Sequence, residues 1–268
     1  MLKKRVITAL CGIPFLIAAI WFDKPLPWFL IAVAVWGVLA VFEFYRMVAE
    51  SKVPPLTYFG LIWTLLFILS PHFDYDILAP PLLLTSAVVL SLIWLLLRPQ
   101  KEGAFAGWAW TIAGILYIGW LLSYLVALRE LDDGRNWVFL ALFATFGSDT
   151  AAFFAGRALG RHKLSPHISP QKTWEGAIAG LLGAIVISLL FTIPTPLSLP
   201  LSYGQAILLG LLVSIFGQLG DLAESLLKRS MGVKDSGRLV PGHGGFLDRM
   251  DSIVFASIVV YYYVVWAM

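Results

Sequence analysis

Long apolar runs recur along the whole chain, and they restrict its fold more than any other feature. A helix needs about 20 apolar residues to cross the hydrocarbon core of a bilayer. Only 13% of the residues are charged, whereas soluble domains carry about 25%. The sequence therefore predicts an all-α, polytopic helical membrane bundle. Candidate transmembrane helices lie at roughly 6–22, 26–42, 56–70, 77–97, 104–128, 136–156, 176–193, 205–220 and 250–268.

These runs predict about nine transmembrane helices. Runs 56–70 and 205–220 are short, so each is expected to be tilted, extended by flanking residues, or re-entrant. Run 104–128 is long enough to be kinked at Gly114 or Gly119. No linker or low-complexity segment interrupts the helices, so residues 1–268 are expected to form a single transmembrane catalytic domain.

The distribution of positive charge predicts the orientation of the bundle. Cytoplasmic loops of membrane proteins carry an excess of Lys and Arg. If the N-terminus is cytoplasmic, 16 of the 19 Lys and Arg residues fall on the inside and Lys24, Arg129 and Arg135 fall outside. The C-terminus is then outside. We expect a multi-pass protein of the cell membrane, in which the first run is a retained signal anchor, with an active site that faces the cytoplasm.

Two long polar segments on the expected cytoplasmic side, 157–175 and 221–249, are the candidate reaction site. The charged residues of a shorter inside segment, Glu43, Arg46, Glu50 and Lys52, are expected to form a solvated loop. Asp149 precedes the first polar segment and lies within an apolar run. A carboxylate at such a depth usually faces an aqueous cavity or an ion, although a buried Asp satisfied by neighbouring polar side chains is the alternative.

The first polar segment ends at the start of a helix. A helix is expected to begin at Thr173-Trp174-Glu175-Gly176. Its first backbone N–H groups, together with Lys172, could bind an anionic phosphate. The same residues also fit an ordinary capped helix start. The pattern alone leaves both interpretations open.

The second polar segment begins on a helix. Asp221, Ser225 and Lys228 recur at helical spacing on one face, and Glu224 lies one turn from Lys228. Gly232 is expected to end this helix. The arrangement predicts a carboxylate and a cation on the same side of one helix.

A glycine-rich loop follows that helix. The loop Pro241-Gly242-His243-Gly244-Gly245 allows positive φ and a close approach of its backbone to a ligand. A lone His such as His243 is more often a structural donor than a catalyst. Asp248 and Asp251 then lie three residues apart at the start of the last helix. If the helices on either side of the loop are neighbours, Asp221 and Asp248 can share a metal ion.

Residues Ser225 to Asp251 resemble the signature of the phosphatidate cytidylyltransferase family, the CDP-diacylglycerol synthases. That signature reads Ser-x-apolar-Lys-Arg, then Lys-Asp, then Pro-x-His-Gly-Gly-x-x-Asp-Arg-x-Asp, and the chain matches it nearly throughout. Two departures are mild: Val240 replaces a larger apolar residue, and Gln171 stands where a second Lys is common. Matching upstream pairs are Asp149-Thr150, Gly156-Arg157, Ser169-Pro170, Lys172-Thr173 and Glu175-Gly176.

The resemblance implies transfer of the cytidylyl group of CTP to phosphatidate, which gives CDP-diacylglycerol and pyrophosphate. It also implies a helical bundle in the lipid bilayer with a cytoplasmic funnel and a divalent metal site. Oxygen ligands favour Mg²⁺, with a second monovalent or divalent cation as a further candidate. CTP and phosphatidate are the expected partners, no nucleic acid is expected, and a homodimer is compatible with the sequence.

The resemblance also assigns roles to individual residues. The metal ligands are Asp221 and Asp248, with Asp251 and Asp149 as further ligands. The catalytic candidates are Asp221, Asp248, Lys228, Arg229, Lys234, Asp235 and His243. The substrate-binding candidates are Arg157, Ser169, Lys172, Thr173, Glu175, Ser225, Gly244, Gly245 and Arg249.

Three other activities fit part of the sequence. A CTP-dependent lipid kinase of the polyprenol or phytol type would share the Lys-Asp and His-Gly-Gly features but transfer the γ-phosphoryl group to an alcohol. A transporter or channel would use Asp149 as an intramembrane ion site. A CDP-alcohol phosphotransferase is disfavoured because its Asp-Gly-x-x-Ala-Arg opening is absent before Asp248.

Overall fold

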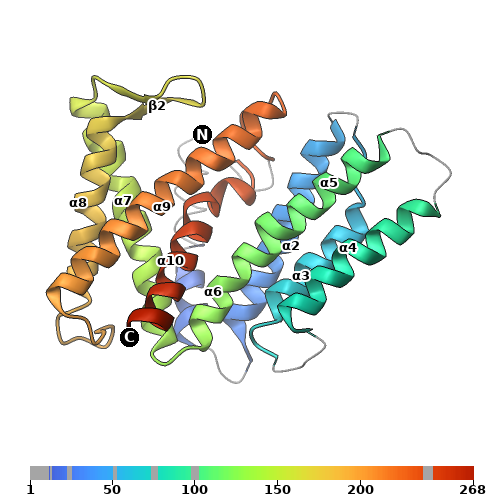
Figure 1. Ribbon diagram of the computed structural model, residues 1–268. Helices are drawn as coiled ribbons and strands as arrows, with labels where there is room; N and C mark the ends of the chain where they lie inside the picture. Colours follow the sequence, from blue (N-terminus) through green and yellow to red (C-terminus); the bar gives the residue numbers. More distant parts are fainter. Residues whose placement is uncertain are drawn as a thin grey trace. The chain divides into compact units, whose positions relative to one another are not determined.

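The computed structural model describes residues 12, 14–22, 26–50, 53–73, 78–97, 103–237 and 244–268 (Figure 1). The chain divides into two compact units. The first comprises Met1–Glu130 and Asp235–Asp248, and the second comprises Leu131–Lys234 and Arg249–Met268. That the whole chain forms one catalytic domain stays a prediction.

The first unit is helical, and a fully buried tyrosine ties three of its helices together. The Tyr45 hydroxyl donates to the carbonyl oxygen of Thr111 at 2.7 Å. A Cβ atom at either Gly60 or Gly114 would overlap the Tyr45 ring, so only glycine allows α3 and α5 to approach α2 this closely. The helices are α2 (Trp28–Glu50), α3 (Thr57–Leu69), α4 (Pro80–Leu96), α5 (Ala104–Gly114), the π-helix η2 (Ile115–Trp120) and α6 (Leu121–Glu130).

The π-helical stretch lies where the sequence predicted an irregularity. It begins directly after Gly114 and includes Gly119. A Cβ atom at Gly119 would come within 2.9 Å of the Thr64 Cα atom. The glycine therefore lets this irregular turn pack directly against the backbone of α3.

The second unit contains four long helices and a hairpin. Its elements are α7 (Gly134–Leu159), β1 (Lys163–Ser165), β2 (Ser169–Thr173), α8 (Trp174–Leu190), α9 (Tyr203–Ser230) and α10 (Asp251–Ala267). The antiparallel strands β1 and β2 form a hairpin at one end of α7 and α8 (Figure 1). The short 3₁₀ turn η3 (Leu247–Arg249) precedes α10.

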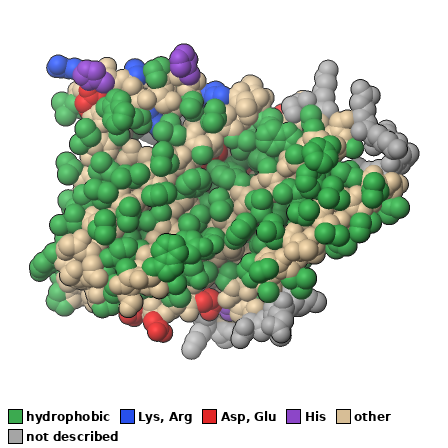
Figure 2. All heavy atoms as spheres, in the orientation of Figure 1, with side chains coloured by type: hydrophobic (Ala, Val, Ile, Leu, Met, Phe, Trp, Pro, Cys, Tyr) green, Lys and Arg blue, Asp and Glu red, His purple; other side chains and the backbone are tan. Residues whose placement is uncertain are grey.

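Helix α8 carries small residues on one face and large apolar residues on another. Its buried residues are Gly176, Gly180, Ala184 and Ser188, which recur every four positions. Its large exposed residues also recur every four positions: Ile178, Leu182, Val186 and Leu190. Small residues allow close packing between helices within a membrane, where lipid covers the large apolar side chains. Figure 2 shows such apolar side chains over the flank of this unit.

Polar side chains also connect the helices of the second unit. The Ser148 and Ser214 hydroxyls are 2.7 Å apart, and the Gln218 amide donates to Ser214 Oγ at 2.9 Å and to the Ala177 carbonyl at 3.2 Å. These contacts join α7, α8 and α9. On α9, Ser214 and Gln218 lie about two turns and one turn before Asp221. These contacts therefore help to fix the position of that carboxylate.

The structure confirms an all-α membrane protein in outline. Among the described residues, α2, the α5–α6 region, α7 and α9 are long and apolar enough to cross a membrane. The runs predicted from residue 26 onward each correspond to a helix. The described part of the first run is helical at 14–21. The number of crossings and the orientation of the two termini stay predictions.

The expectation for the charged residues after the second apolar run differs from the structure. Residues 43–50 were expected to be a loop, but Glu43, Arg46 and Glu50 lie within α2, and Glu43 is buried. Lys52 lies outside the described residues. The helix at 205–220 continues into the second polar segment, as expected, and α9 extends from Tyr203 to Ser230. A capping box formed by Ser202 and Gln205 begins this helix, and Gly232, with φ of 71°, follows its end as predicted.

Candidate active site

The β1–β2 hairpin fixes the start of α8. Thr173 is the N-cap residue, and its hydroxyl accepts a hydrogen bond from the Gly176 N–H at 3.2 Å. The Glu175 carboxylate is 2.7 Å from His162 Nδ1 and also accepts from the His162 N–H. In this structure the two predicted substrate-binding residues therefore hold the hairpin on the helix, and their contacts with substrate stay predictions. Ser169 begins β2 opposite Ser165.

Lys172 and Asp221 meet across the second unit. The Lys172 ammonium lies 2.8 Å from Asp221 Oδ2, and the two side chains are 22% and 31% exposed. One residue comes from the end of β2 and the other from the middle of α9. The structure thus brings together the predicted phosphate-binding lysine and a predicted metal ligand, with both side chains partly exposed and the lysine ammonium nitrogen itself buried.

Two further carboxylates lie near this ion pair. Asp149 on α7 and Asp251 at the start of α10 each interact electrostatically with Asp221, and Asp149 also interacts with Lys172 and Arg249. Asp149 has exposed surface, but burial also removes much of the water around its carboxylate, so both interpretations of this residue stay predictions. A Cβ atom at Gly220 would overlap the Asp251 carbonyl oxygen. Close packing of α9 on α10 therefore keeps the two acidic positions near each other.

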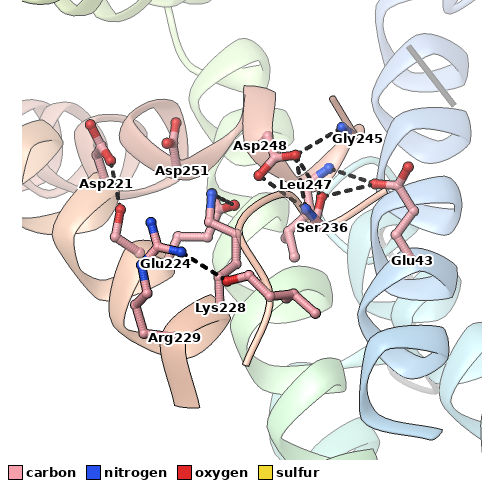
Figure 3. A network of polar contacts seen from close by, with 12 residues as sticks. Glu43, Asp221, Glu224, Lys228, Arg229, Ser236, Gly245, Leu247, Asp248 and Asp251 are labelled. Carbon is pink, nitrogen blue, oxygen red and sulfur yellow. Dashed lines mark hydrogen bonds and ion pairs between the residues drawn. The ribbon is translucent and has the colours of Figure 1, made fainter. Parts of the chain in front are cut away.

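Further along α9, two predicted catalytic cations are held by short contacts. Lys228 Nζ lies 2.9 Å from Glu224 Oε1, and Glu224 is fully buried (Figure 3). Arg229 donates to the Val233 carbonyl at 3.1 Å and to the Ile168 carbonyl in the hairpin turn at 3.4 Å. Ser225 donates to Asp221 Oδ1 at 3.4 Å, as expected for residues on one helical face. Sequence reasoning placed Glu224 correctly but gave it no role.

In the first unit, Asp248 organises the described ends of the glycine-rich loop. Its Oδ2 atom accepts hydrogen bonds from the Gly245 N–H at 2.8 Å, the Ser236 N–H at 3.0 Å and the Ser236 hydroxyl at 3.0 Å (Figure 3). Gly244 has φ of 87°, which confirms the positive φ predicted for this loop. Asp248 lies in the 3₁₀ turn η3, not in the last α-helix as expected.

The remaining predicted site residues differ in what the structure says of them. Arg157, Lys234, Asp235 and Arg249 are exposed. His243 lies outside the described residues. Asp221 and Asp248 belong to different units, so the metal site that they were expected to share stays a prediction.

Exposed basic residues surround the hairpin end of the second unit. Figure 2 shows blue and purple side chains gathered there, in contrast to the apolar flank. The exposed residues at this end are Arg157, Arg161, His162, Lys163 and His167. A positive surface of this kind attracts anionic phosphates.

The donor atoms near Asp221 suit a hard cation. They are carboxylate oxygens, which Mg²⁺ prefers, and Mg²⁺ in phosphate-transfer sites is commonly held by one or two carboxylates and the substrate phosphates. Within the described ranges, no three His, Cys, Asp or Glu side chains form a ready-made metal cluster. That the carboxylates near Asp221 hold Mg²⁺ together with substrate phosphates stays a prediction.

A comparison with known proteins places the chain in a family. The model of the cytidylyltransferase family matches residues 3–267. The chain belongs to this family. Among its cytidylyltransferase relatives, the phosphatidate cytidylyltransferase of Bacillus subtilis is 35% identical over 266 residues, which are 97% of each chain.

Two other relatives are similar over nearly the whole chain. The phosphatidate cytidylyltransferase of Synechocystis is 35% identical over 301 residues, covering 99% of this chain and 97% of that protein. The chloroplastic phosphatidate cytidylyltransferase 4 of Arabidopsis thaliana is 35% identical over 297 residues, covering 98% of this chain and 73% of that protein. The similarity therefore includes both units and not only the polar segments.

Proposed function

We infer that this membrane protein transfers the cytidylyl group of CTP to phosphatidate and releases pyrophosphate. The observation that carries this conclusion is full-length similarity to phosphatidate cytidylyltransferases in a chain whose Lys172–Asp221 pair remains partly exposed among further carboxylates and cations. The product is CDP-diacylglycerol, a precursor for phospholipid synthesis.

The reaction needs positioning and charge neutralisation more than it needs a strong base. A phosphate oxygen of phosphatidate attacks the α-phosphorus of CTP, a new P–O bond forms, and the bond to the β-phosphate oxygen breaks as pyrophosphate leaves. The attacking phosphate is already ionised near neutral pH. Preorganised cations that face the developing charge supply most of the stabilisation in such reactions.

We propose that cations of the second unit provide this stabilisation. Lys172 would contact phosphate oxygens beside Asp221, with Arg249 nearby; for this contact its ammonium nitrogen, which is buried in the structure, would have to become accessible. The buried Glu224 carboxylate fixes the position of the Lys228 ammonium group on α9. A cation oriented in this way loses less conformational freedom when it binds a phosphate than a free lysine does.

We also propose that the enzyme requires Mg²⁺. Asp221 would hold the ion, with Asp149, Asp248 and Asp251 as further ligands and a second cation as a further candidate. When bound, Mg²⁺ would neutralise charge on the phosphates of CTP. Asp149, Asp221 and Asp251 repel one another electrostatically, and this repulsion favours a cation beside them.

The setting of the reaction is likewise a proposal. The excess of Lys and Arg in the expected inside loops supports an active site that faces the cytoplasm from the cell membrane. CTP would enter from water, and phosphatidate would enter from the bilayer. A homodimer remains compatible with this arrangement.

A double-label assay tests the activity against the lipid-kinase alternative. Purified protein in detergent is incubated with phosphatidate, Mg²⁺ and CTP labelled either in the α-phosphate or in the γ-phosphate. We expect label in the lipid product only from α-labelled CTP, and label in pyrophosphate only from γ-labelled CTP. In a parallel reaction in which a polyprenol or phytol replaces phosphatidate, transfer of the γ-label to that alcohol would instead identify a kinase. Reactions without phosphatidate and with the Asp221→Asn variant provide the controls.

A further inference from the structure

Helix α2 contacts the glycine-rich loop through a buried glutamate. Glu43 is 3% exposed. Its Oε2 atom accepts a hydrogen bond from the Leu247 N–H at 3.1 Å and one from the Ser236 hydroxyl at 3.3 Å. These donors lie on opposite sides of the loop, in the residues before and after it (Figure 3). One carboxylate thus joins the two ends of the loop.

Two glycines pack directly against this carboxylate. A Cβ atom at Gly237 would overlap Glu43 Oε1, and a Cβ atom at Gly245 would overlap Glu43 Oε2. Each glycine therefore lets the backbone approach the carboxylate more closely than any other residue could. This fit gives a physical reason for glycine at positions 237 and 245.

The same seryl hydroxyl connects Glu43 to Asp248. Ser236 Oγ lies 3.3 Å from Glu43 Oε2 and 3.0 Å from Asp248 Oδ2. Two buried carboxylates therefore converge on one serine. Asp248 in turn accepts from the Gly245 N–H. The contacts connect Glu43, Ser236, Asp248 and Gly245 in one network. Glu43 is its only member among these four that does not come from residues 236–248.

A second residue of α2 supports the same segment. Trp36 lies seven residues before Glu43, so the two side chains share a face of the helix. Its indole N–H donates to the Phe246 carbonyl at 2.9 Å. Helix α2 thus holds residues 246 and 247 by two separate hydrogen bonds.

We propose that Glu43 is a positioning residue for cytidylyl transfer: it holds together the two ends of the glycine-rich loop, at Ser236 and Leu247. The inference rests on the proposed function, because the loop belongs to the family signature. A buried carboxylate without hydrogen-bonded partners is strongly unfavourable. At this position Oε2 is compensated by backbone and hydroxyl donors from both ends of the loop, whereas Oε1 is buried without a hydrogen-bond partner among the described residues. Without Glu43, the Leu247 N–H would be buried with no acceptor from α2.

Three variants test the proposal. Glu43→Ala removes the acceptor, whereas Glu43→Gln keeps a carbonyl oxygen that can accept from both donors. Glu50→Gln is the matched control: it removes the same charge from the same helix, at an exposed residue that pairs only with Arg46 at 3.5 Å in the described contacts. The readouts are kcat and KM for CTP, and hydrogen exchange of peptides that cover residues 244–250.

We expect Glu43→Ala to lower kcat on the order of 10²-fold, with KM changed less than about threefold, because small displacements of positioned groups cost about this much. Exchange in 244–250 should accelerate at least about tenfold. Glu43→Gln should remain within about threefold of wild type in both readouts, as should Glu50→Gln. Wild-type exchange and rates in Glu43→Ala would overturn the proposal, and so would a Glu43→Gln variant as impaired as Glu43→Ala.

If Glu43→Ala does not fold, the Ser236→Ala variant tests the proposal in its place. This variant removes only the hydroxyl between the two carboxylates and leaves the Ser236 N–H bonded to Asp248. Faster exchange in 244–250 with a lower kcat would support the proposal, and unchanged values would refute it. Because exchange is measured without substrate, it also separates failure of this inference from failure of the proposed activity, which would leave wild type without CDP-diacylglycerol product.

Discussion

The Lys172–Asp221 ion pair offers the sharpest test of the active site. Asp221→Asn and Lys172→Gln each remove one charge and keep most of the side-chain shape. Removing a preorganised electrostatic group of this kind typically costs about 10² to 10³ in rate. We expect each single substitution to lower kcat/KM by that amount, and the fold to persist because both side chains are partly exposed.

The size of the coupling between the two residues follows from their geometry. Unit charges 2.8 Å apart attract by about 6 kcal/mol at an effective dielectric constant of about 20. Exposure of 22% and 31% lets water screen much of this attraction. After screening, we expect a net coupling energy between Lys172 and Asp221 of roughly 2 kcal/mol, which corresponds to about 30-fold in rate. The double variant should therefore be about 30-fold more active than the product of the two single effects predicts.

The assay measures CDP-diacylglycerol formation from α-labelled CTP for wild type, both single variants and the double variant at saturating Mg²⁺. Asp132→Asn, at an exposed position before α7, is the chemical control and should retain the wild-type rate. Melting temperatures should agree within a few degrees. Near-normal rates in both single variants would refute the site, and fully multiplicative effects would show that the pair does not act as a unit.

Further predictions concern topology, packing and the metal. In a Cys11→Ser background, a cysteine at the exposed residue Gln171 should resist an impermeant thiol reagent in intact cells, whereas one at the exposed residue Thr195 should react. The reverse labelling would invert the orientation. Gly210→Leu should lower the melting temperature, since even a Cβ atom would come within 2.7 Å of the α8 backbone, and overpacking costs about 1 to 3 kcal/mol. Gly204→Ala, with no atom within 4 Å of the added Cβ, is its control, and equal melting temperatures would contradict the packing. A chelator such as EDTA should abolish activity and added Mg²⁺ should restore it; full activity in the chelator would exclude the proposed requirement.

The helices were predictable because the bilayer imposes a simple rule on the sequence. Each apolar run from residue 26 onward became a helix, since a chain without water must satisfy its backbone hydrogen bonds internally. Local chemistry was also readable: Gly232 follows the end of α9, and Lys228 pairs with Glu224 one turn away. These features depend on residues that are near one another in sequence.

The run at 205–220 shows that hydropathy alone does not mark where a helix ends. Hydropathy ended the run at Asp221, whereas the helical spacing of Asp221, Ser225 and Lys228 predicted the longer helix that α9 forms to Ser230. The β1–β2 hairpin, in contrast, was missed. Its strands are only three and five residues long, too short to show an alternating pattern.

Glu43 shows what the sequence could not reveal. On its own, a charged residue near the end of an apolar run predicts a solvated position, which was wrong. Its burial depends on Ser236 and Leu247, which lie 193 and 204 positions away. No local pattern records such a contact.

The sequence by itself determined the membrane setting, the helical segments and the family, and it supplied the candidate residues of the active site. Hydrophobicity and motif spacing depend on residues that are near one another in the chain, so both can be read from the sequence. Only the tertiary structure decided that Lys172 pairs with Asp221 and that Glu43 joins the ends of the glycine-rich loop. Those contacts join residues that lie far apart in the sequence, and at Glu43 they depend on the close approach of the backbone at Gly237 and Gly245.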